Sequence, residues 1–277
     1  MPLTKEQEQK IRDATPMDDF TIRLMLRKSP KLAELICRII LEEQNLKVLK
    51  IETQYDASRG GIARGITMDA VVEDNQGRVH NLEIQLDARG LSPERGRYHA
   101  GVLDVEYLNP GEDVIQLPET FIIFICDHDP YGKGEPVYLV DRMIRTKNGT
   151  VLKEYNDRQH ILYVNGDWDE DDDLGKLMHD FHCSRPEDMY YPLMAERLRY
   201  LKETPEGRME MNGITEMIID STRDQVQHEN AERMLKKGMD ETVVAELLAM
   251  PIEYVESIKD ELAYEFCHYT GKECTWP

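Results

Sequence analysis

The sequence predicts an α/β fold in which helices flank a mixed sheet and a helical extension follows at the C-terminal end. Three observations support this prediction. Apolar and polar residues alternate over 66–86, which is typical of a β-hairpin. Residues Phe121–Cys126 are all apolar, as expected of a strand at the centre of a sheet. From Asp173 onward, the apolar residues recur at helical spacing.

Length and composition suit a folded protein with one main domain. A chain of 277 residues can form one large domain, or one domain with a small appendage. Apolar residues make up 40% of the chain, which is enough for a hydrophobic core and excludes wholesale disorder. We place the main domain at 1–205 and the helical extension at 206–277.

The chain is strongly acidic, with 34 basic and 54 acidic side chains and a net charge of −20. This charge argues against a protein that coats DNA or an anionic membrane through its overall charge. Any polyanionic partner must therefore contact a local basic patch or a divalent metal ion.

The cysteines and the apolar runs indicate the compartment. Five scattered cysteines suit a reducing environment better than a disulfide framework. The polar N-terminal stretch lacks the apolar core of a signal peptide. The longest apolar run, Phe121–Cys126, is far shorter than the ~20 residues of a membrane helix. We therefore expect a soluble, cytoplasmic protein with no membrane partner.

The remaining elements follow in order along the chain. Helical spacing predicts helices over about 18–28 and 31–43, separated by Ser29-Pro30. Three further strands are expected at Val48–Thr53, Val137–Val140 and Ile161–Val164. Helices are then expected at Leu174–Phe181, at Tyr190–Glu203 and from about 206 to 235.

Residues 240–262 resemble a compact helix–turn–helix with Met250-Pro251 at the turn. A second helix that reads DNA would carry Arg, Lys, Asn or Gln. The second helix here instead carries a mainly acidic or uncharged set: Glu253, Tyr254, Glu256, Ser257 and Lys259. We therefore favour a packing or oligomerisation hairpin, and a homo-oligomer formed through these helices, over a DNA reader.

The hairpin brings two carboxylates together if its loop has three residues. With a loop at 75–77 and Gly77 in the left-handed region, Asp69 lies opposite Glu83. Gln85 then shares a face with Glu83, because strand side chains repeat every two residues. A two-residue loop would instead place the two acids on opposite faces. The alternating apolar residues Leu82, Ile84 and Leu86 are expected to face the core.

Opposed carboxylates suggest a metal site. Their β-carbons would lie about 5 Å apart, and like charges at that distance are unfavourable unless a cation lies between them. Carboxylate oxygens suit Mg²⁺ or Mn²⁺, and an ion held there can activate water and neutralise the charge of a scissile phosphate. The alternative is an ordinary solvated hairpin that carries charged residues.

The order of Asp69, a short hairpin and Glu83-Ile84-Gln85 resembles the PD-(D/E)XK nuclease superfamily, in which D…(E/D)xK positions the metal and the attacking water. Further segments resemble one branch, the PD-(D/E)XK nuclease family transposases, which are related to the recombination-promoting nucleases. These segments are Met17–Phe20, Asn81–Gln85, Arg95–Tyr98, Leu117–Ile125 and Gly175–Phe181. Together they extend over roughly 15–260.

The resemblance implies a restriction-endonuclease-like fold and a DNA endonuclease that depends on Mg²⁺, with Mn²⁺ as an alternative. It implies Asp69 and Glu83 as metal ligands, and Asp18 or Asp19 as a third. Gln85 stands where the general pattern has Lys, as in other members of this branch. Glutamine is neutral and can only form hydrogen bonds, so the resemblance leaves the positive partner unassigned.

Arginines around the hairpin bear on DNA binding. Arg95 and Arg97 could contact phosphate, support the site through a carboxylate pair, or lie on a solvated helix. The stretch 59–97 is locally rich in arginine: Arg59, Arg64, Arg78, Arg89, Arg95 and Arg97. This favours the nuclease over the alternative function, a catalytically weak or inactive nuclease fold that serves as a protein interaction module.

The acidic run 167–173 begins like an EF-hand loop but does not match one. Its sixth position is Asp172 rather than Gly, and its twelfth is Met178 rather than Glu. We expect a solvated loop that ends in a helix N-cap at Asp173.

Overall fold

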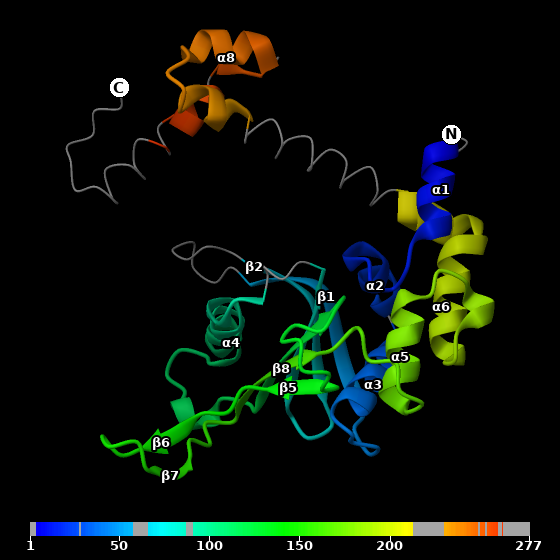
Figure 1. Cartoon of the computed structure of the whole chain (residues 1–277), viewed down its shortest axis with the longest axis vertical. Coiled ribbons are helices and arrows are strands. Elements are labelled where there is room, and N and C mark those ends of the chain that lie inside the picture. The colour runs from blue at the N-terminus through cyan, green and yellow to red at the C-terminus, as the bar shows by residue number, and fades with distance from the viewer. Residues whose placement is uncertain are drawn as a thin grey trace. The chain divides into compact units, whose positions relative to one another are not determined.

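The computed structural model describes residues 4–27, 29–57, 66–86, 91–212, 230–248, 250–252, 254–259 and 262. The chain divides into two compact units, Met1–Asn212 and Gly213–Pro277, whereas the boundary expected from the sequence lies at 205 (Figure 1). None of the described helices is long and apolar enough to span a membrane.

The first unit is built on a six-stranded mixed sheet, which confirms the predicted α/β class with a mixed sheet. The strand order is β1-β2-β3-β4-β8-β5. Strands β1 to β3 are antiparallel neighbours, β3, β4 and β8 run parallel, and β5 returns antiparallel to β8. The strands of this sheet are β1 (Val48–Ala57), β2 (Ile66–Asp74), β3 (Val79–Gln85), β4 (Thr120–Cys126), β5 (Val137–Leu139) and β8 (Gln159–Val164). Two further strands, β6 (Met143–Arg145) and β7 (Val151–Glu154), form a separate two-stranded sheet.

Helices lie on both sides of the six-stranded sheet, with α4 on one side and α3, α5 and α6 on the other (Figure 1). The helices of this unit are α1 (Lys5–Asp13), α2 (Asp19–Leu26), α3 (Pro30–Ile40), α4 (Pro93–Tyr107), α5 (Asp173–His182) and α6 (Pro192–Glu203), with short 3-10 turns at η2 (Val114–Gln116) and η3 (Pro186–Asp188). The predicted central strand β4 is buried over its whole length.

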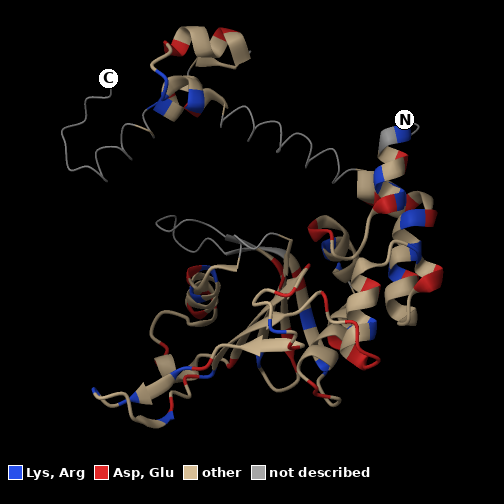
Figure 2. Cartoon of the chain, in the orientation of Figure 1, with Lys and Arg blue, Asp and Glu red and all other residues tan. Residues whose placement is uncertain are grey.

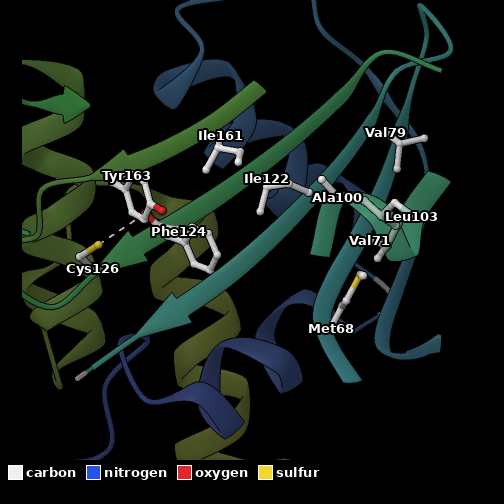
Figure 3. Close-up of a cluster of buried hydrophobic side chains, with 10 residues drawn as sticks. All are labelled: Met68, Val71, Val79, Ala100, Leu103, Ile122, Phe124, Cys126, Ile161 and Tyr163. Atoms are coloured by element: carbon white, nitrogen blue, oxygen red, sulfur yellow. Dashed lines mark hydrogen bonds between the residues drawn. The ribbon is translucent and has the colours of Figure 1, made fainter. Parts of the chain in front are cut away.

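The hydrophobic core beneath α4 fixes that helix on the sheet. Ala100 and Leu103 pack against Ile122 and Phe124 of β4, and the same cluster extends to Tyr163 of β8 (Figure 3). The cluster thereby places the N-terminal turns of α4 beside the middle of β3, where the predicted site residues lie.

Two predictions about individual residues are wrong. Leu86 is 51% exposed rather than in the core, because β3 ends at Gln85. The N-cap of α5 is Asp172 rather than Asp173, since the Asp172 carboxylate accepts a hydrogen bond from Gly175 N at 2.7 Å.

The second unit contains α8 (Glu241–Leu248) and short helical segments before and after it. Its buried apolar residues form one cluster inside the unit: Ala231, Leu235, Val244, Ala245, Val255, Ile258 and Leu262. The two helices of the expected helix–turn–helix therefore pack on each other through their apolar sides. Much of the helix expected over 206–235 lies outside the described residues.

Candidate active site

The turn of the β2–β3 hairpin sets the register of the site. Gly77 has a φ of 76°, a left-handed conformation that glycine adopts without strain. Asp74 N donates to Arg78 O at 3.1 Å, which closes the three-residue loop. Ala70 lies opposite Leu82, and continuing this register by one residue places Asp69 opposite Glu83. The structure thus has the register on which the site prediction depends.

A buried ionic network holds this end of the hairpin. The Asp74 carboxylate accepts hydrogen bonds from Arg78 Nε at 2.7 Å and pairs with His80 Nε2 at 2.9 Å. Both terminal nitrogens of Arg78 reach the Glu43 carboxylate, each at 2.7 Å. Burial alone would raise the pKa of Asp74, but hydrogen bonds with His80 and Arg78 hold it well below its usual value. Arg78 is 7% exposed and bound to two carboxylates, so this member of the arginine-rich stretch serves the hairpin and not a phosphate contact.

At the other end of the hairpin the two predicted carboxylates converge. Glu83 Oε1 accepts a hydrogen bond from Asp69 N at 3.2 Å, and Asp69 Oδ2 accepts one from Ile84 N at 3.0 Å. Each side chain thus caps a backbone amide of the opposite strand. Glu83 is 1% exposed and Asp69 is 9% exposed, so both acidic groups lie largely out of water.

A third carboxylate, that of Asp19 at the start of α2, lies beside this pair. Burial is the largest cause that raises the pKa of Asp69 to about 9, and the charges of Glu83 and Asp19 add to it. Asp19 Oδ1 is buried and accepts no hydrogen bond from the amide, hydroxyl or cationic groups of the described residues. Asp18 is engaged elsewhere, because its Oδ2 accepts a hydrogen bond from Thr15 N at 2.6 Å. Of the two candidate third ligands, Asp19 is the one next to Asp69.

Cationic and polar side chains surround the three acids. Arg23 pairs with Asp19, and its Nε lies 3.8 Å from Asp69 Oδ1. Arg95 Nη2 lies 3.5 Å from Glu83 Oε2, and His99 Nδ1 lies 3.5 Å from Glu83 Oε1. Arg95 therefore pairs with a site carboxylate, which is one of the three roles that the sequence left open.

Arg23, His99 and Asn81 are site residues that sequence reasoning missed. Asn81 Nδ2 lies 2.9 Å from His99 Nδ1 and so links β3 to α4. The available signal was helical spacing: Arg23 follows Asp19 by four residues, and His99 follows Arg95 by four. Those spacings place each pair on one face of a helix.

The other predicted site residues lie at the end of β3, on α4 or outside the described residues. Gln85 is the last residue of β3 and is 7% exposed, and its carbonyl accepts a hydrogen bond from Asp127 N at 3.0 Å. Arg97 lies exposed on α4. Three other members of the arginine-rich stretch lie outside the described residues: Arg59, Arg64 and Arg89.

The kind of atoms that the site offers as ligands decides whether a metal ion fits here. Within the described ranges, no group of three or more His, Cys, Asp or Glu side chains is arranged as a metal centre. The opposed pair and Asp19 nevertheless offer only carboxylate oxygens to a cation. Among the described residues, no amide, hydroxyl or cationic group donates a hydrogen bond to Asp19 Oδ1. Hard divalent ions such as Mg²⁺ and Mn²⁺ prefer such oxygens, so the residues present fit an ion of this class.

The raised pKa of Asp69 predicts how stability depends on pH without metal. An aspartate whose pKa is raised by folding holds its proton more tightly in the folded state, so stability falls as pH rises from about 4 to about 9. In EDTA, Asp69→Asn should therefore melt above the parent at about pH 8, by about 2–4 °C for each kcal/mol of stability gained, because it no longer has to take up a proton on folding. The gap should close at about pH 4, where the parent Asp69 is protonated.

Thermal melting monitored by circular dichroism across this pH range checks the prediction. Asp129→Asn is the matched control, because the Asp129 carboxylate accepts hydrogen bonds from Gly132 N, Gly134 N and Tyr138 Oη. That variant should melt below the parent at about pH 8. An Asp69→Asn protein that melts below the parent at every pH would show that the Asp69 charge is stabilising.

No protein-family model, curated protein or solved structure matches this chain.

Proposed function

We propose that the chain is a metal-dependent DNA endonuclease of the transposase-like PD-(D/E)XK branch, which hydrolyses phosphodiesters with Mg²⁺ or Mn²⁺. The observation that supports this most is the convergence of Asp69 and Glu83 in a buried position, with Asp19 beside them. Two buried carboxyl groups with a third, partly exposed one beside them are costly unless a proton or a cation is shared among them. The mixed sheet with acids on adjacent hairpin strands also agrees with the resemblance.

Asp69, Glu83 and Asp19 are the residues that would hold the ion. When bound, the ion supplies positive charge at the scissile phosphate and lowers the pKa of a water molecule. Asp69 must give up its proton to bind a cation, because its pKa of about 9 keeps it neutral near pH 7. The cost of burying these charges is then offset by the ion rather than by a proton.

Two side chains stand in for the missing lysine. Arg95, whose side chain is 40% exposed, lies at the solvent side of Glu83 and can contact a phosphate oxygen while staying near the carboxylate. Gln85 can orient a water molecule through its amide but cannot supply charge. In this proposal the cation is therefore Arg95, and Gln85 is a positioning residue.

The free cysteines and the exposed apolar residues of α8 bear on the cellular location and on the assembly of the protein. We place the protein in the cytoplasm, where reduced thiols persist; Cys37 and Cys126 are free and buried. A homo-oligomer would form through the C-terminal helices, where Val243 and Leu247 lie exposed one turn apart on α8. These two residues are the ones on which such an interface would depend.

One set of observations favours the alternative, a catalytically weak or inactive nuclease fold that serves as a protein interaction module. Each acid of the site already has a cationic neighbour: Arg23 lies beside Asp19 and Asp69, and Arg95 lies beside Glu83. Gln85 is also neutral where the general pattern has a cation. A site neutralised internally in this way would bind a divalent ion weakly.

Cleavage of a supercoiled plasmid tests the two functions against each other. The parent should nick or linearise the plasmid with Mg²⁺ or Mn²⁺ and not with EDTA. Gln85→Lys should cleave at least as fast, because it adds the cation that the general pattern supplies. Gln116→Lys is the matched control, since it adds the same charge on an exposed 3-10 turn. If neither the parent nor Gln85→Lys cleaves with either metal, the interaction module takes the place of the enzyme.

A further inference from the structure

The separate two-stranded sheet forms an arm, defined here as residues 141–158. All four residues of β7 are exposed, and the arm projects from the end of the first unit (Figure 1). An isolated two-stranded hairpin is marginally stable in water, so its ends need support. Arg142 ties the base by pairing with Asp157 and donating to Gln159 O at 3.2 Å. Thr146 closes the tip, where its N donates to Thr150 O at 2.8 Å.

The arm is basic although the protein is acidic. The arm has five basic and three acidic side chains, whereas the whole chain has a net charge of −20 (Figure 2). Its acids lie toward the base, and residues 143–153 contain Arg145, Lys147 and Lys153 and no acidic residue. All three side chains are exposed, and none forms an ion pair with another described residue. Cations left uncompensated on a protein with excess carboxylates are complementary to a polyanion.

The shape of the arm narrows the choice of polyanion. The major groove of B-form DNA admits a two-stranded β-ribbon, and apolar side chains there contact thymine methyl groups. Apolar side chains of the arm are available for such contacts, since Val151 is 49% exposed and Leu152 is 61% exposed. A ribbon with basic side chains at its tip and along its strands, and with exposed apolar groups on β7, fits this groove.

The position of the arm links it to the candidate site. Arg95, near the N-terminal end of α4, contacts Glu83. Asp104 follows nine residues later on the same helix, about 14 Å further along its axis. Burial raises the pKa of Asp104, and the Asp157 charge raises it further while Arg142 lowers it, so the base of the arm lies beside this part of α4. Site and arm therefore lie along one helix.

We propose that the arm binds duplex DNA, with the ribbon in the major groove and Arg145, Lys147 and Lys153 on the flanking phosphates. The identity of the ligand rests on the proposed function, because a site that cleaves phosphodiesters makes DNA the polyanion to be held. Contacts along α4 would then keep the duplex close to Glu83 and Asp69.

Fluorescence anisotropy in EDTA measures binding independently of cleavage. The probe is a labelled duplex of about three helical turns, titrated between about 50 and 200 mM salt. Replacing the three arm cations by Gln should weaken binding at least about tenfold and reduce the magnitude of the salt slope by about 2–3, because about three phosphate contacts are lost. The matched control replaces Lys5, Arg185 and Arg199, which are exposed on other elements of the first unit, by Gln.

The outcomes separate this inference from the proposed function. Parent-like duplex binding by the arm variant, or an equal loss in the control, overturns the role of the arm, whether or not the parent cleaves plasmid. Loss of binding to anionic vesicles or to a second copy of the chain, with duplex binding unchanged, also overturns it. If the parent never cleaves DNA but binds the duplex through the arm, the DNA-binding role of the arm is supported and the proposed nuclease function is rejected.

Discussion

Asp69→Asn and Glu83→Gln are each expected to lower the rate of metal-dependent DNA cleavage by about 10²–10³-fold, which corresponds to the loss of about 3–4 kcal/mol of transition-state stabilisation. Both acids lie out of water and face each other across the hairpin. An amide of the same shape keeps the packing but removes the charge that attracts the ion. Initial rates of plasmid nicking in Mg²⁺ and Mn²⁺ measure the effect.

Matched variants separate loss of the site from loss of the fold. Asp18→Asn should keep the rate within a few-fold, since the Asp18 carboxylate accepts a hydrogen bond from Thr15 N and is not part of the site. Asp19→Asn should lower the rate, because the Asp19 carboxylate lies beside Asp69. In EDTA, none of the variants should melt far below the parent, and Asp69→Asn should melt above it at about pH 8. If Asp69 were instead one partner of a structural ion pair with Arg23, its removal would cost about 3–5 kcal/mol of stability. A strongly destabilised Asp69→Asn protein, or one that cleaves at the parent rate, would contradict the site.

Asp74→Asn is expected to lower the free energy of unfolding by about 3–5 kcal/mol, because it leaves the buried Arg78 cation without one of its carboxylate partners. The pKa of Asp74 is held below its usual value, so its contribution to stability is present above about pH 4 and is lost as the pH falls through the lower folded value. The difference between parent and variant should therefore shrink in acid.

Urea denaturation at about pH 7 and about pH 3 measures this difference. Asp113→Asn serves as the control, since Asp113 is an exposed acid outside the network and only caps the turn at Ile115. A loss below about 1 kcal/mol at pH 7, in the range of exposed ion pairs, would contradict the role of the network in holding the hairpin.

Local signals in the sequence were sufficient for the hairpin and the central strand. A polar loop that ends in Gly77 separates two alternating runs, and this pattern predicts the hairpin. The sequence left two loop lengths open, and the structure has the three-residue loop. The apolar run of β4 predicts a strand with neighbours on both sides, and the structure places β3 and β8 there. The three-residue loop is what places Asp69 opposite Glu83.

Long-range contacts account for what was missed. Arg78 is buried because Glu43, which follows α3 and lies 35 residues away, reaches it, and no local pattern indicates that pair. Helix α4 was not bounded in advance because its apolar residues do not share one face: Leu103 is buried, while Val105 is 57% exposed. The choice between Asp18 and Asp19 depended on the residue at which α2 begins. Because α2 begins at Asp19, Asp18 is its N-cap and Asp19 lies at the site.

Binding of Mn²⁺, measured by titration calorimetry near pH 7 in two buffers of different ionisation enthalpy, tests the central claim most directly. The account predicts saturable binding with release of about one proton, because Asp69 is neutral near pH 7 before the ion binds. It also predicts that Asp69→Asn abolishes both the binding and the proton release, while Asp18→Asn keeps them. Absence of binding to the parent, or binding that Asp69→Asn leaves unchanged, would contradict a metal site at Asp69 and Glu83.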